Sequence, residues 1–98
     1  IETFNFDRCS GTISYNTTIQ SAPPLPDFNV TWSCAFSLSN RFLYVSTSIE
    51  DTNYIYQFDL NATNILSSRI TLDTLYSPPI QPGSLKLAPD GKIYFSCA

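Results

Sequence analysis

Apolar and polar residues alternate along most of the chain, in short runs separated by Asn, Ser, Gly and Pro. Successive side chains of a strand point to opposite faces. Phe4 and Phe6 would therefore share one face of a first strand, and Tyr54, Tyr56 and Phe58 would share one face of a later strand. The runs are rich in aromatic and β-branched residues, and no long stretch has apolar residues at helical spacing. The pattern therefore predicts an all-β protein.

Eight strands are expected from these runs, joined by polar or proline-rich connections. The expected strands are Phe4–Asp7, Thr12–Ile19, Trp32–Ser37, Phe42–Ser46, Tyr54–Phe58, Arg69–Leu75, Leu85–Ala88 and Ile93–Phe95. Prolines cluster in Ala22–Pro26 and Pro78–Pro82, which we expect to be loops that cross between sheets. The polar run Thr47–Asn53 is expected to be a loop as well.

One pattern occurs twice, at Phe36–Ser46 and again, one residue shorter, at Leu87–Ser96. Each copy has an apolar residue, a polar turn, a basic residue, an apolar–Tyr–apolar run and a Ser, which predicts a β-hairpin. The pair Phe6-Asp7 likewise matches Phe58-Asp59. These matches share an offset of roughly 50 residues, which indicates an internal repeat.

A repeat of this length with four short strands is typical of a β-propeller. Residues 1–20 would then form the second half of one blade, residues 28–76 a complete blade and residues 84–98 the first half of the next. One blade and two halves cannot close a ring, and a lone repeat cannot bury its apolar faces. We therefore expect about two blades' worth of a larger propeller, with a small β-sandwich as the alternative.

Three stretches carry a resemblance to a known family: Asn40–Ser46, Ile55–Leu60 and Leu87–Tyr94. They resemble the YVTN- or WD40-like propeller regions of secreted Bacteroidota proteins. The proteins in question are of the gliding-motility kind and are exported by the type IX secretion system. The opening Phe6–Gly11 is similar to the same family, whereas Leu38 stands where that family usually has Pro. The resemblance implies a secreted or cell-surface location.

The composition argues against two classes of partner, nucleic acids and the membrane interior. The net charge of −3 and the five basic residues argue against nucleic acid, which is bound by clustered Lys and Arg. No apolar run approaches the length that inserts into a membrane. The expected partners are the remaining blades of the same protein or neighbouring chains of an assembly, together with a protein or glycan ligand.

The sequence holds no His, which excludes an imidazole base within this chain. We expect Asp7 and Asp59 to cap turns after their strands, since they recur at matching positions of the repeat. We therefore predict a non-catalytic binding or scaffold segment without cofactor or metal. The alternative is a part of a propeller enzyme, similar to a lactonase or quinoprotein, whose catalytic residues lie outside this chain.

Two aromatic residues beside the proline-rich loops, Trp32 and Tyr76, are the candidate ligand contacts, because a ring offers a sugar an apolar face. Among the three cysteines, Cys34 and Cys97 would lie at one rim of the propeller and Cys9 at the other. A Cys34–Cys97 disulfide is thus the most feasible internal pair, and free or externally paired thiols are the favoured state.

Overall fold

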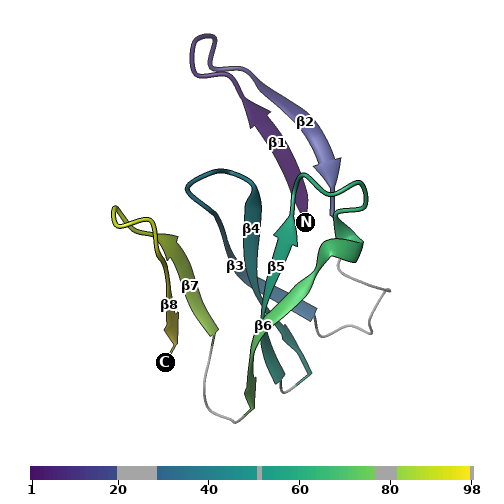
Figure 1. Ribbon diagram of the computed structural model, residues 1–98, viewed down its shortest axis with the longest axis vertical. Helices are drawn as coiled ribbons and strands as arrows, with labels where there is room; N and C mark the ends of the chain where they lie inside the picture. Colours follow the sequence, from purple (N-terminus) through teal and green to yellow (C-terminus); the bar gives the residue numbers. More distant parts are fainter. Residues whose placement is uncertain (20–28, 51, 77–81, 98) are drawn as a thin grey trace.

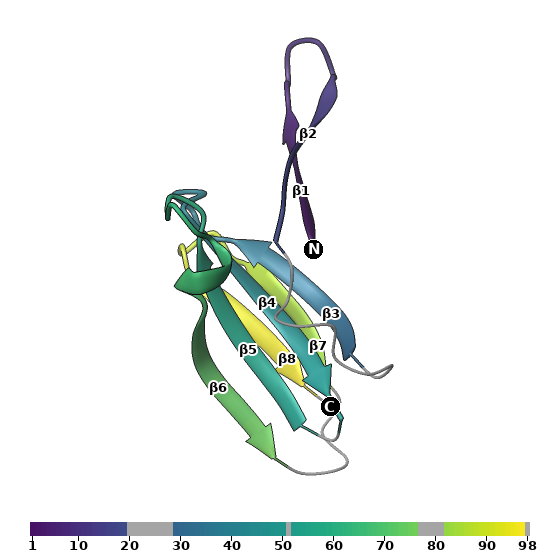
Figure 2. The same cartoon turned by 90° about the vertical axis from the view of Figure 1, so that its right-hand side faces the viewer.

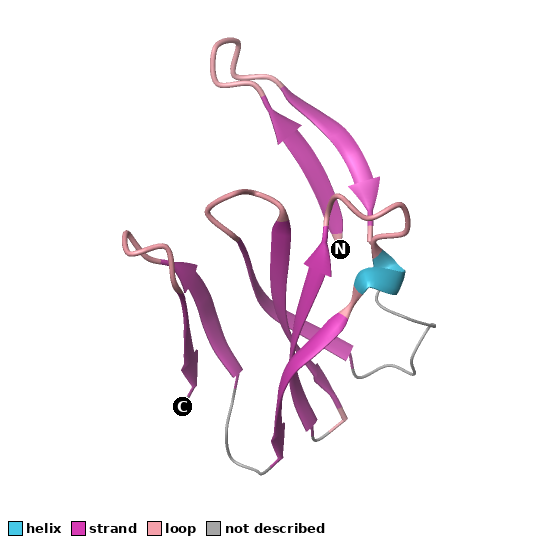
Figure 3. Ribbon diagram, in the orientation of Figure 1, coloured by secondary structure: helices cyan, strands magenta, loops and turns pink. Residues whose placement is uncertain are grey.

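The computed structural model describes residues 1–19, 29–50, 52–76 and 82–97 of the 98-residue chain. The described residues are all-β apart from one turn of 3₁₀ helix (Figure 1, Figure 3). The elements are β1 (Glu2–Phe6), β2 (Ile13–Thr18), β3 (Asn29–Phe36), β4 (Phe42–Ile49), β5 (Thr52–Asp59), η1 (Leu66–Ser68), β6 (Ile70–Tyr76), β7 (Pro82–Leu87) and β8 (Ile93–Cys97).

All eight expected strands are present, which confirms the all-β class. The loop expected at Thr47–Asn53 is wrong, because β4 and β5 run through this segment and turn near Glu50, whose φ is 53°. Its polar side chains find partners within the sheet: Thr47 Oγ1 donates to the carbonyl of Val30 at 3.0 Å. Buried polar groups that are hydrogen-bonded in this way carry little penalty, so a polar run can continue a strand.

The strands form three antiparallel sheets in chain order: β1-β2, then β3-β4-β5-β6, then β7-β8. The four-stranded central sheet is a simple meander in which each strand pairs with the next. The N-terminal hairpin projects away from the rest of the molecule in both views (Figure 1, Figure 2). The C-terminal hairpin meets the central sheet through β7.

One face of the central sheet carries the hydrophobic core, and we call it the front face. Its buried members are Leu43, Val45, Tyr56 and Phe58, and Ile19, which directly follows β2, packs onto them. Directly opposed pairs share a face, and the register Leu43↔Phe58 and Val45↔Tyr56 places these residues together. The N-terminal hairpin therefore contacts the central sheet through its base.

The other face, the back face, receives the C-terminal hairpin. Contacts of β7 fall on β3 and β4. The Leu85 backbone N–H donates to Ser33 Oγ at 2.9 Å, and Leu85 is buried there. Ser33 pairs with Ser46, which marks both as residues of the back face. The central sheet thus lies between a preceding and a following pair of strands.

The stack leaves much surface open. The chain exposes 6913 Å², whereas a compact monomer of 11.0 kDa would expose roughly 5,600 Å². The radius of gyration is 14.3 Å, against about 12.6 Å for a compact domain of this length. Large apolar side chains account for part of the excess, because Phe4, Phe6, Ile13 and Tyr15 of the N-terminal hairpin are all exposed.

Candidate functional site

The carboxylates of Asp7 and Asp59 close matching turns. Asp7 Oδ1 accepts the backbone N–H of Cys9 at 2.8 Å, and Asp59 Oδ1 accepts that of Asn61 at 3.0 Å. Each aspartate thus bonds the N–H two residues ahead, which is the geometry of an Asx turn. The structure confirms the capping role that the repeat predicts for both residues.

Hydrogen bonds of these turns also set the acidity of the two groups. The backbone N–H of Cys9 lowers the pKa of Asp7 below its ordinary value. The Arg41 guanidinium lowers the pKa of Asp59, and it forms an ion pair with Asp59 at 3.0 Å. Hydrogen bonds to an ionised carboxylate favour the charged form. Both groups are therefore hydrogen-bond acceptors at neutral pH and are poorly suited to act as general acids.

A third aspartate closes the hairpin between β7 and β8. Asp90 accepts the backbone N–H of Lys92 at 2.9 Å, and this bond lowers the pKa of Asp90. Its other oxygen accepts the Tyr94 hydroxyl at 2.7 Å, which raises the pKa of that phenol. The Asp90 carboxylate thus also stabilises a turn by accepting a backbone hydrogen bond. Within the described ranges, no group of three or more His, Cys, Asp or Glu side chains gathers as a metal site would require.

Trp32 sits on a β-bulge. The register of β3 against β4 shifts between Thr31 and Ser33, so Trp32 is the additional residue. Its indole Nε1 donates to Ser48 Oγ at 2.8 Å, and the Ser48 hydroxyl donates to Asn53 Oδ1. Bulges commonly aim a side chain toward a functional site. Trp32 is 50% exposed, so part of this hydrogen-bonded side chain is accessible to a ligand.

Tyr76 is the last residue of β6, where its backbone pairs with Thr52. The sheet order β3-β4-β5-β6 places Trp32 and Tyr76 on opposite edges of the central sheet. Three strand spacings of about 4.8 Å separate them by roughly 14 Å. The structure therefore does not bring the two predicted contact residues into one site. The side chain of Tyr76 and the proline-rich loops at 20–28 and 77–81 lie outside the described residues.

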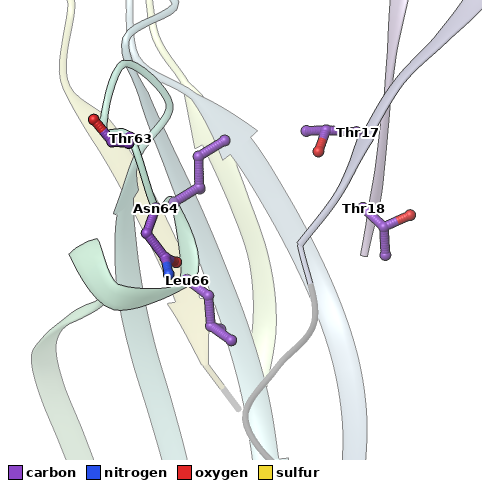
Figure 4. A pocket seen from close by; sticks show the side chains of 6 residues that line it. Thr17, Thr18, Thr63, Asn64 and Leu66 are labelled. Carbon is purple, nitrogen blue, oxygen red and sulfur yellow. The ribbon is translucent and has the colours of Figure 1, made fainter.

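A hollow of about 340 Å³ lies between the N-terminal hairpin and the segment that enters η1. Thr17 and Thr18 form one wall, and Asn64 and Leu66 stand across from them (Figure 4). The walls are neutral, and Asn64 Oδ1 already accepts the Ser67 backbone N–H at 3.1 Å. The hollow offers shape and hydroxyl groups and carries no charged side chain.

A larger cleft of about 490 Å³ lies between β1-β2 and two turns of the central sheet. Four amide side chains line it, together with aromatic rings and one guanidinium: Asn5, Asn16, Asn40, Asn61, Phe4, Phe6, Phe36 and Arg8. Each amide is both donor and acceptor, which matches the hydroxyl groups of a sugar. Sequence reasoning missed this cleft because it depends on how the N-terminal hairpin lies against the central sheet.

All three cysteines are free and exposed in the structure. The candidate Cys34–Cys97 pair is thus not joined in it. Cys34 lies on β3 opposite Val45, and Cys97 lies at the end of β8 opposite Pro82. Both thiols are accessible to a partner or an oxidant.

Comparison with protein-family models, with curated proteins and with solved structures finds no match to this chain. Among the described residues, the structure contains no helix of the length and apolarity that a membrane span requires.

Proposed function

We propose that this chain is a segment of a β-propeller and serves as a non-catalytic binding or scaffold unit of a secreted or cell-surface protein. The observation that carries the proposal is the arrangement of the sheets in chain order: the β7-β8 hairpin packs on the central sheet through β7, and the β1-β2 hairpin contacts the opposite face through Ile19 at its base. Each sheet thus contacts the one that follows it in the sequence. Successive blades of a propeller are arranged in the same way around their axis.

The face that each sheet turns toward its neighbour supports the propeller arrangement. In the central sheet, Leu43 and Val45 belong to the front face, toward the preceding hairpin. Their repeat equivalents, Ile93 and Phe95, pair with Leu87 and Leu85, and Leu85 is buried against the back face of the central sheet. The central sheet and the β7-β8 hairpin thus turn the same repeat face toward the sheet that precedes each of them. A two-layer sandwich would instead turn equivalent faces toward one another.

The titratable groups favour binding over catalysis. Three aspartates of the described chain each close a turn with their carboxylate, and hydrogen bonds hold the pKa of each below its ordinary value. The larger cleft, which we call the asparagine cleft after its four amide side chains, offers donors and acceptors beside phenylalanine rings and the Arg8 guanidinium. That combination suits a glycan or another polar ligand.

Small-angle scattering tests the architecture. For the monomeric chain in dilute solution we expect a radius of gyration close to the 14.3 Å of the structure. A value near the roughly 12.6 Å of a compact domain would favour a closed sandwich and overturn the propeller segment.

A glycan array followed by calorimetric titration of the bound sugars tests the binding role. We expect Asn61→Ala to weaken binding, since its amide lines the cleft, and the neighbouring Thr63→Ala to leave it unchanged as a matched control. Trp32 is the single tryptophan, so a change in its emission would show whether a ligand also reaches the bulge. Turnover of a bound ester or lactone by the chain would contradict the non-catalytic role.

A further inference from the structure

The asparagine cleft contains an arginine without a partner of its own. Arg41 forms an ion pair with Asp59 at 3.0 Å, and Arg69 Cζ lies 4.7 Å from the centre of the Tyr56 ring. Arg8 is the third arginine of the chain, and it lines the cleft. Its side chain forms neither an ion pair nor a hydrogen bond with any described residue. The guanidinium is therefore available to an anionic group of a ligand.

Most amide side chains of the cleft are available as well. Within the described part of the chain, the side chains of Asn5, Asn40 and Asn61 form no hydrogen bond. The fourth amide, Asn16 Nδ2, donates to Thr3 Oγ1 at 3.2 Å. Each amide presents two N–H donors and a carbonyl acceptor. Free amides and phenylalanine rings in one lining match the hydroxyl groups and the apolar face of a sugar ring.

Hydrogen-bonded turns hold one wall of the cleft in place. The Asn40 N–H donates to Ser37 O at 2.9 Å, and the Leu60 N–H donates to Arg41 O at 2.8 Å. The second bond ties the turn that carries Asn40 to the turn that carries Asn61. A wall that is fixed before binding reduces the entropy that is lost when a ligand binds.

The charge of the lining distinguishes among saccharides. The chain has a net charge of −3, yet the side chains that line the cleft include one guanidinium and no carboxylate. A chain of this charge does not attract an anion over a long distance, so an anionic ligand has to be held by local contacts. A guanidinium forms two parallel N–H···O bonds with a carboxylate, which a neutral hydroxyl group does not match.

We propose that the asparagine cleft binds an acidic saccharide. The carboxylate of a uronic acid residue pairs with Arg8, and the sugar hydroxyl groups bond to the free amides. The volume of about 490 Å³ lies within the range of about 300–1,000 Å³ that is typical of small-molecule sites. This inference rests on the binding role in the proposed function, and it names the class of ligand for that role.

Calorimetric titration of the chain with uronic acid trisaccharides tests the ligand class. The probes are the trisaccharides of galacturonic, glucuronic and mannuronic acid, each with its methyl ester as a matched neutral probe. We expect binding of at least one acid, at least about tenfold tighter than that of its ester, because a hydrogen bond to a charged group is stronger than one to a neutral group.

Substitution of the arginine tests the site. Arg8→Gln should weaken binding of the acid by about tenfold and leave binding of the ester nearly unchanged. Arg8→Lys keeps the charge without the planar fork and should recover part of the lost affinity. Lys92→Gln removes the same charge at an exposed residue outside the cleft and should have little effect.

An ester that binds as tightly as its acid overturns the inference, as does an Arg8→Gln variant with unchanged affinity for the acid. Failure of all three acids to bind at millimolar concentration overturns it too. So does an oligoglutamate peptide that displaces the acid at equal concentration, because the ligand would then be an acidic peptide.

Neutral sugars separate this inference from the proposed function. If neutral sugars bind and Asn61→Ala weakens them while the acids show no preference, the binding role stands and the acidic ligand class fails. If no sugar of the glycan array binds, the binding role itself fails. The propeller architecture is tested separately by scattering from the monomer.

Discussion

The central sheet and the N-terminal hairpin place the same kinds of residue in opposite environments. Tyr56 and Phe58 of β5 are 7% and 1% exposed, whereas their repeat equivalents in β1, Phe4 and Phe6, are 54% and 62% exposed. The strands share their alternation and their closing Asx turn. They differ in their neighbours: within the described ranges, β5 is flanked by β4 and β6, whereas β1 pairs with β2 alone.

The comparison shows that the repeat specifies strands and turns locally, whereas burial comes from the neighbouring units. A repeat unit contacts its neighbours along the stack and depends on them for its core. The aromatic side chains of the N-terminal hairpin are therefore exposed because no second sheet packs on them within the described residues.

The largest expected effect comes from truncating the buried member of the comparison. Phe58→Ala removes a fully buried ring and should lower the free energy of unfolding by about 3–5 kcal/mol. Phe6→Ala changes the equivalent exposed ring and should cost less than about 0.5 kcal/mol. Urea unfolding followed by Trp32 fluorescence measures both. Equal losses at the two positions would contradict the different environments.

A smaller effect is expected where the C-terminal hairpin meets the central sheet. Leu85→Ala should lower the free energy of unfolding by about 2 kcal/mol, the low end of the range for a buried leucine. Leu38→Ala, at an exposed leucine, is the control. If both variants unfold at the same urea concentration, β7 does not pack on the back face in solution.

The hydrogen bond across the two sheets should contribute less again. Ser33→Ala leaves the Leu85 backbone N–H without its acceptor, which should cost about 1 kcal/mol. Hydrogen exchange of the Leu85 amide should quicken in parallel. Unchanged exchange at Leu85 would show that this N–H has another acceptor.

The smallest expected effect is a dependence of stability on pH. The pKa values of Asp7 and Asp59 are lower in the folded state than their ordinary 3.8. Their contribution is thus complete above the unfolded pKa and is lost as the pH falls through the folded pKa values. We expect stability to be flat from about pH 7 to about pH 5 and to fall below about pH 4. Asp59→Asn should flatten the acid limb, and an unaltered limb would rule out this carboxylate as a cause.

The strands and the paired Asx turns could be predicted from the sequence, because alternation, turn residues and an internal repeat are local signals. The strand run through Thr47 was missed, since its hydroxyl is satisfied by the Val30 carbonyl of a neighbouring strand. The asparagine cleft also depends on contacts between strands far apart in the sequence. Asn5 and Asn61 line it together only because the N-terminal hairpin lies beside the turns of the central sheet. Trp32 could be named from the sequence, but its bulge and its bond to Ser48 could not.

Native-state hydrogen exchange of the monomeric chain tests the central claim most directly, by comparing amides of β1-β2 with those of β4-β5. We predict that amides of β4 and β5 exchange only through global unfolding, whereas those of the N-terminal hairpin exchange much faster by local opening, since few buried contacts hold it. Equal, high protection in both regions would contradict the open stack, because it would require a sheet of the same chain to cover the aromatic face of β1.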